Sequence, residues 1–118
     1  MLGSRLEEFG ANCWLINTGW IGGGVGVGER IALSATRTIV DAVTSDSLAS
    51  VETKPDPIFG LPIPVAIEGV DAKLLQPQQN WASESDYKEA ANNLAERFKE
   101  NFKQFESFMP ELVKSGPK

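Results

Sequence analysis

The stretch that decides the fold is CWLINTGWIGGGVGVGERIALSATR, residues 13–37. It begins with four bulky apolar residues, Cys13 to Ile16, which predict a short buried strand that ends at Asn17 and Thr18. Six glycines then fall within ten positions, and the lack of side chains lets the backbone adopt positive φ. These residues are Gly19, Gly22, Gly23, Gly24, Gly26 and Gly28. Such a backbone can turn its N–H groups toward an anion, so a phosphate-binding loop is one candidate.

Neither common nucleotide motif fits this loop. Gly23 and Gly28 have the spacing of a P-loop, but Glu29 and Arg30 stand where that motif needs Lys and then Ser or Thr. The dinucleotide fingerprint G-x-G-x-x-G also fails, because Val27, Glu29 and Ile31 occupy the positions of its third glycine. The alternative is a mobile or tightly turned surface loop, and glycine content alone favours that interpretation.

Length and composition indicate one soluble domain. The chain has 118 residues, of which 42% are apolar and 23% charged, values that are ordinary for a globular protein. A net charge of -5 and a pI near 4.7 argue against a nucleic-acid surface. No apolar run approaches the ~20 residues that span a bilayer, and residues 1–10 lack the pattern of a secretory signal. We therefore expect a cytoplasmic protein without membrane or nucleic-acid partners.

The scarcity of cysteine and histidine excludes several chemistries. Cys13 is the single cysteine, so the sequence predicts no internal disulfide and a buried thiol in the strand. The chain has no histidine, which excludes Cys–His and Ser–His catalysis within it and disfavours a self-contained zinc site. We predict neither a catalytic residue nor a metal ligand in this chain.

The flanking segments give a coarse order of elements. Residues 1–10 predict a short amphipathic helix that stops at Gly10. After the glycine loop, residues 30–33 predict a brief strand, and Ser34 is expected to cap a helix over residues 34–44.

The second half of the chain is of a different kind. Residues 51–81 hold five of the seven prolines, which excludes regular helix and predicts an extended arm on a partner surface or an edge strand. Ser83 with Asp86 predicts the start of a long amphipathic helix that ends near Pro110 and carries a phenylalanine stripe. That stripe is expected to be core or docking surface. Residues 110–118 predict a flexible tail.

The predicted fold class is therefore mixed α/β with few strands, a proline-rich extended arm and a long C-terminal amphipathic helix. Two or three strands with one arm leave unpaired edges and an open core. We expect the missing partners to lie on another chain or in a missing N-terminal part.

The residues that surround the glycine loop also carry a family resemblance. The run WLINTGW at 14–20, the glycines at 22–28, and then Arg30, Ile31, Thr36 and Arg37 resemble the C-terminal portion of ATP-dependent phosphoenolpyruvate carboxykinase. A weaker similarity continues to residue 106, and the first residues resemble an internal helix of that family. Residues 1–109 are therefore expected to be a partial C-terminal nucleotide-binding domain that begins in mid-domain.

The resemblance implies a function and a set of contacts. The whole enzyme converts oxaloacetate and ATP to phosphoenolpyruvate, ADP and carbon dioxide in gluconeogenesis, with magnesium and manganese ions. Its phosphate-binding loop and metal ligands lie upstream and are absent here. Arg30, the backbone of Ile31, and Thr36 fall where the family contacts ATP, which would make this chain the adenine-proximal wall.

The residue types at these positions suit a nucleotide but allow other interpretations. An arginine can stack on a purine or pair with phosphate, and a hydroxyl near a helix start lies where anions are favoured. Alternatively, Arg30 pairs with Glu29 and Thr36 caps its own helix. Three positions depart from the family pattern: Glu29 replaces a usual lysine, Gln78 an arginine and Asn80 a threonine.

Three hypotheses follow from the sequence. The leading one is a carboxykinase fragment that is inactive alone and whose partner is the remainder of the enzyme. The second is a stand-alone module that binds a nucleotide or anion at the glycine loop. The third is a structural module that self-associates through its exposed apolar surface.

Overall fold

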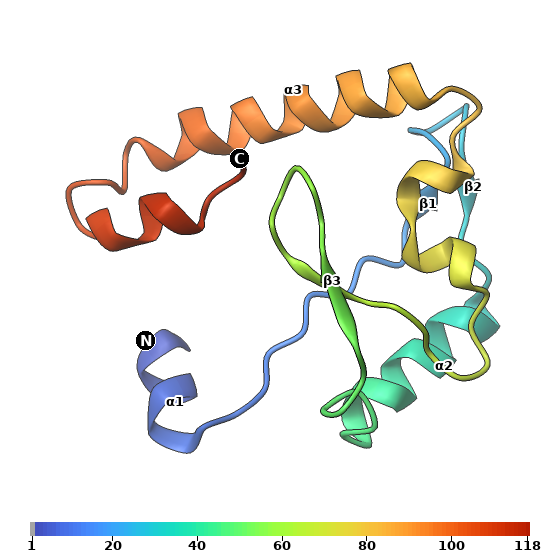
Figure 1. Cartoon of the computed structure of the whole chain (residues 1–118), viewed down its shortest axis with the longest axis horizontal. Coiled ribbons are helices and arrows are strands. Elements are labelled where there is room, and N and C mark those ends of the chain that lie inside the picture. Colours follow the sequence, from blue (N-terminus) through green and yellow to red (C-terminus); the bar gives the residue numbers. More distant parts are fainter. Residues whose placement is uncertain (1) are drawn as a thin grey trace.

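The computed structural model describes residues 2–118, which form a mixed α/β arrangement of helices and two very small sheets (Figure 1). The elements in chain order are α1 (Leu2–Phe9), β1 (Trp20–Ile21), β2 (Glu29–Arg30), α2 (Leu33–Thr44), β3 (Thr53–Pro55), β4 (Pro62–Pro64), the 3-10 helices η1 (Ala72–Leu75) and η2 (Pro77–Asn80), α3 (Glu84–Phe102) and the 3-10 helix η3 (Pro110–Ser115). The predicted fold class, mixed α/β with few strands, is confirmed at this level.

Each sheet is a single antiparallel hairpin. Trp20 lies opposite Arg30 in the first, so the glycine loop forms its tip. Lys54 lies opposite Ile63 in the second, which therefore arises from the proline-rich segment. The prolines sit at the ends of β3 and β4, where the missing N–H groups do least damage to a two-stranded ladder.

The first helix ends as the sequence predicts, but the strand after it does not form. Gly10 follows α1 with φ of 59°, a left-handed conformation that glycine adopts at low cost. Residues 11–18 then form neither helix nor strand, and Cys13 is exposed. The predicted buried strand at 13–16 is therefore wrong for this chain, because the described residues supply no neighbouring strand to pair with it.

The boundaries of α2 also differ from the prediction. The strand before it is Glu29–Arg30, and the helix begins at Leu33, so Ser34 lies inside the first turn. Ala32 occupies the N-cap position and makes no side-chain hydrogen bond to the helix. The start of α2 therefore lacks a side-chain cap, so no capping side chain accepts a hydrogen bond from its first N–H groups.

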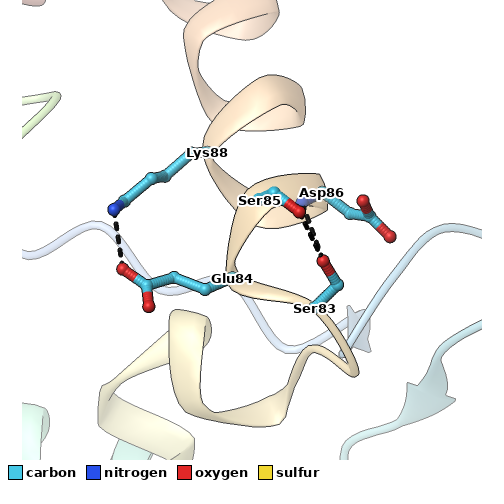
Figure 2. A network of polar contacts seen from close by, with 5 residues as sticks. All are labelled: Ser83, Glu84, Ser85, Asp86 and Lys88. Carbon is cyan, nitrogen blue, oxygen red and sulfur yellow. Dashed lines mark hydrogen bonds and ion pairs between the residues drawn. The ribbon is translucent and has the colours of Figure 1, made fainter.

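The start of α3 follows its predicted chemistry. The Ser83 hydroxyl accepts a hydrogen bond from the Asp86 N–H at 3.3 Å, as Figure 2 shows. One turn on, Lys88 lies 2.6 Å from Glu84, and this hydrogen bond and charge lower the pKa of Glu84. The helix ends at Phe102 rather than near Pro110, because the chain then turns through shorter bonds such as Phe105 N–H to Phe102 O, 2.7 Å.

The segments on either side of α3 are more regular than the sequence suggests. Although no α-helix forms between residues 51 and 81, η1 and η2 do, with Pro77 at the first position of η2 where its missing N–H costs nothing. Residues 110–115 form η3, and the Lys118 N–H donates to the Ile58 carbonyl at 2.8 Å. The flexibility of residues 110–118 and the division at residue 109 both stay predictions.

The structure is open, with a small interior. Its buried apolar residues are Leu48, Ile67, Ala91 and Ala95, and the stripe on α3 is largely exposed, including Phe98 at 53%. The accessible surface is 9042 Å², whereas a compact monomer of 12.8 kDa exposes about 6,300 Å². The radius of gyration is 15.9 Å against about 13.5 Å for a compact chain of this length. This molecule therefore exposes about 2,700 Å² more than a compact domain does.

Candidate functional site

The three residues predicted to contact a nucleotide lie on one strand–turn–helix corner. Arg30 ends β2 and is exposed, Ile31 follows it, and Thr36 belongs to the first turn of α2. The Ile31 N–H donates to the Gly19 carbonyl at 3.1 Å and so holds this corner to the base of the glycine hairpin. The Ile31 carbonyl accepts no hydrogen bond from the described residues and is available to a ligand.

The side chain of Arg30 is not engaged within the described chain. The ion pairs between described residues all lie on α1 or along α3 and its C-terminal end. Glu29, its neighbour on β2, is exposed and joins none of them. The alternative in which Arg30 pairs with Glu29 is therefore not observed, and the guanidinium is free to meet an outside group.

The hydroxyl of Thr36 is distinct from those of the other threonines on α2. Thr38 and Thr44 donate their hydroxyls back to the carbonyls of Ser34 and Val40, at 3.1 and 3.0 Å. Thr36 makes no such bond to any described residue, although its N–H donates to the Ala32 carbonyl at 3.1 Å. No buried side-chain polar atom lacks a partner among residues 2–118, so this unpaired hydroxyl reaches solvent. It is not the helix cap, because Ala32 holds that position.

The uncapped start of α2 adds donors to the same corner. Within the described chain, the N–H groups of Leu33, Ser34 and Ala35 have no hydrogen-bond acceptor. Free N–H groups at a helix start carry partial positive charge and favour an anion. Sequence reasoning missed this feature because it assigned the cap to Ser34, and no sequence signal marks Ala32 as the cap.

The glycine loop is tightly turned and packed. The N–H groups of Val27 and Gly28 both donate to the Gly24 carbonyl, at 3.1 and 2.9 Å. A Cβ on Gly22 would lie 2.7 Å from the Asn80 carbonyl, so the loop base sits directly on η2. These contacts support the structural interpretation of the loop, in which the glycines allow close backbone approach.

The three residues that depart from the family pattern, Glu29, Gln78 and Asn80, differ in their exposure and contacts. The Asn80 amide donates to the carbonyls of Lys73 and Gln76, at 2.6 and 3.3 Å, and thereby ties η2 to η1. Gln78 is exposed, as is Glu29 on β2. Asn80 therefore contributes to the support under the glycine loop, while the other two face solvent.

Concavities, clusters of metal ligands and long apolar helices were also sought among the described residues. Two concavities among the described residues lie elsewhere, one against Lys54 and Gln78 and the other against Thr38 and Glu68, and neither includes Arg30, Ile31 or Thr36. Between residues 2 and 118, no three His, Cys, Asp or Glu side chains gather as a metal ion requires. None of the described helices is both long and apolar enough to cross a membrane.

An exposed arginine beside an uncapped helix start is an arrangement that suits an anionic ligand such as a nucleotide. Comparison with known proteins identifies the family of the chain. The family model described as phosphoenolpyruvate carboxykinase matches residues 1–73. This chain belongs to that family.

Individual relatives extend the match along the chain. A phosphoenolpyruvate carboxykinase (ATP) from Rubrobacter xylanophilus is 47% identical over 118 residues, which is 99% of this chain and 22% of the relative. One from Bacillus cereus is 45% identical over 116 residues, with 98% and 22% covered. One from Bacillus subtilis is 50% identical over 105 residues, with 89% and 20% covered. The chain thus spans about a fifth of the length of these curated relatives.

Proposed function

We propose that this chain forms the adenine-proximal wall of the nucleotide site in an ATP-dependent phosphoenolpyruvate carboxykinase. The reaction converts oxaloacetate and ATP to phosphoenolpyruvate, ADP and carbon dioxide. The observation that carries the proposal is the corner itself, where the Arg30 guanidinium, the Ile31 carbonyl and the Thr36 hydroxyl lie close in sequence with no partner among the described residues. Family membership and the high identity to carboxykinases support it.

Each group has a distinct role in this proposal. The guanidinium of Arg30 stacks on the purine or pairs with a phosphate oxygen, since it is planar and permanently charged. The carbonyl of Ile31 accepts a hydrogen bond from the adenine amino group, and the hydroxyl of Thr36 donates to a nucleotide oxygen or ring nitrogen. These contacts position the nucleotide and take no part in bond breaking.

The chemical step depends on groups outside this chain. Phosphoryl transfer needs cationic groups and metal ions that stabilise the charge on the moving phosphoryl group. The magnesium and manganese that the family resemblance implies do not fit here, because no suitable set of ligands gathers among residues 2–118. We infer that the remainder of the enzyme holds the phosphates and metals and is the partner of this chain.

A hybrid enzyme tests the proposal. In the Rubrobacter xylanophilus relative, the segment that matches this chain is replaced by residues 1–118. We expect the hybrid to form phosphoenolpyruvate from oxaloacetate and ATP, and the isolated chain to show no turnover, because only the hybrid contains the phosphate and metal sites. A folded hybrid without activity, or turnover by the isolated chain, would contradict the proposal.

The role of Arg30 is tested in the same hybrid. Arg30→Ala should raise the KM for ATP about 10- to 100-fold, the loss expected when one charge-assisted contact is removed. The KM for oxaloacetate should change little. Arg97→Ala is the matched control, since Arg97 is also exposed and makes no ion pair among the described residues. An equal effect of both substitutions would exclude a specific contact at Arg30.

A further inference from the structure

The side chain of Asn80 fixes the junction between two 3-10 helices. Its amide donates hydrogen bonds to the carbonyl of Lys73 in η1 and to that of Gln76, which lies between η1 and η2, at 2.6 and 3.3 Å. Both partners are carbonyl oxygens, which only accept, so the amide must present its N–H donors to them. The threonine of the family pattern has a single hydroxyl hydrogen. Asparagine therefore ties η2 to η1 by one more bond than threonine can.

The backbone of Asn80 is also held from its other side. Trp81 follows it directly, and the Trp81 ring meets the ring of Tyr87 in α3 edge to face, with centroids 5.9 Å apart. Aromatic pairs favour this arrangement. The Asn80 carbonyl is thus anchored to η1 through its own side chain and to α3 through its neighbour.

The glycine hairpin rests on this carbonyl. Gly22 directly follows β1, has φ of 80°, and approaches so closely that a Cβ on it would lie 2.7 Å from the Asn80 carbonyl oxygen. Figure 1 shows η1 and η2, in yellow, beside β1 and β2. β1 pairs with β2, which ends at Arg30, and the Ile31 N–H bonds to the residue before β1. A shift of Asn80 is therefore passed through Gly22 and two pairs of strand residues to Arg30 and Ile31.

We propose that Asn80 is a positioning residue of the nucleotide site, which sets the place of Arg30 and Ile31 through its contact with Gly22. This inference rests on the proposed function, in which Arg30 and Ile31 contact the nucleotide. Asn80 acts without touching the nucleotide, since its half-buried side chain is engaged on η1. Small displacements of a binding group weaken its contact steeply. Loss of the amide bonds should therefore lower nucleotide affinity although every nucleotide contact keeps its chemical group.

The hybrid enzyme tests this role with Asn80→Asp. Aspartate has nearly the same shape, but it offers no N–H and turns negative oxygens toward two carbonyl oxygens. We expect the KM for ATP to rise about 10-fold, the effect of one lost hydrogen bond, while kcat and the KM for oxaloacetate change little. Asn80→Thr keeps one donor and should give a smaller rise. An unchanged KM for ATP, with or without a fall in kcat, would overturn the inference.

Gln78→Glu is the matched control. It makes the same change from amide to acid in the same 3-10 helix, but Gln78 is exposed and its amide has no hydrogen bond within the described residues. The KM for ATP should therefore stay close to that of the unsubstituted hybrid. An equal rise in Gln78→Glu and Asn80→Asp would assign the effect to the added charge and overturn the inference.

Amide hydrogen exchange of the isolated chain reads the coupling without any nucleotide. The Ile31 N–H, bonded to the Gly19 carbonyl, should exchange about 10-fold faster in Asn80→Asp than in Gln78→Glu, because the hairpin loses its support. Equal exchange in these variants, with a raised KM for ATP in Arg30→Ala, would overturn the inference and leave the proposed function standing. Faster exchange in Asn80→Asp, with an unchanged KM for ATP in Arg30→Ala, would overturn the proposed contact at Arg30 and leave the coupling to Asn80 standing.

Discussion

Replacement of Gly28 by alanine is expected to disrupt the glycine hairpin. A Cβ at this position would lie 2.5 Å from the Ile21 carbonyl oxygen and closer still to that of Gly23. Both are backbone atoms, so no side chain can move to relieve the overlap. Overpacking of this kind costs about 2 to 4 kcal/mol, and a hairpin with two residue pairs has little stability to lose.

The measurement is amide exchange at Gly28 and Ile31, whose N–H groups bond within the hairpin. We expect it to approach the rate of an unfolded peptide in Gly28→Ala, because opening of the hairpin removes the protection that these two bonds give. Gly24→Ala is the matched control, because a Cβ there would meet nothing within 4 Å and Gly24 does not need a positive φ. Similar exchange in the two variants would show that the close backbone packing at Gly28 does not hold the hairpin together.

Replacement of Asp56 by alanine should open the turn between β3 and β4. Asp56 is 9% exposed, and its carboxylate accepts hydrogen bonds from the N–H groups of Ile58 and Phe59, at 2.9 and 2.6 Å. Loss of a charged acceptor leaves both donors unpaired next to the turn and costs about 2 to 4 kcal/mol. Exchange of the Gly60 amide, which donates to the Asp56 carbonyl, reports the opening of this turn.

The single tyrosine gives an independent readout of the same change. Burial raises the pKa of Tyr87, and the negative charge of Asp56 raises it further. In Asp56→Ala the tyrosinate should therefore form at a lower pH than in the unsubstituted chain, as ultraviolet titration can show. The control is Asp71→Ala, since exposed Asp71 accepts one N–H bond from Lys73 and its loss costs about 1 kcal/mol. If Asp56→Ala and Asp71→Ala changed Gly60 exchange and the Tyr87 titration equally, the burial of Asp56 would not explain its effect on the turn.

Local chemistry made some elements predictable from the sequence. Gly10 ends α1 and Ser83 begins α3 as predicted. Each of these helix ends depends on residues within four positions of one another, so the local sequence is enough to predict it. The corner that carries Arg30, Ile31 and Thr36 was predictable for the same reason. Their proximity follows from closeness in the chain, once the family resemblance had singled them out.

Features that depend on distant partners were not predictable. The strand expected at 13–16 needs a neighbouring strand that the described residues lack, and the bond from the Lys118 N–H to the Ile58 carbonyl joins residues 60 positions apart. Residues of the same type can also have different contacts, which only the structure shows. Thr36 and Thr38 look alike in sequence, yet only Thr38 returns its hydroxyl to the helix backbone. Gly24 and Gly28 likewise differ only in what surrounds them.

The exposed thiol of Cys13 has a practical consequence. Because it is the single cysteine of the chain and lies in the open segment, a maleimide dye attaches there and nowhere else. A fluorophore at that position sits at one end of the apolar run and senses the polarity of whatever comes to rest against it. A dye at Cys13 would therefore report assembly from the segment that the sequence predicts to be buried and that the structure leaves exposed.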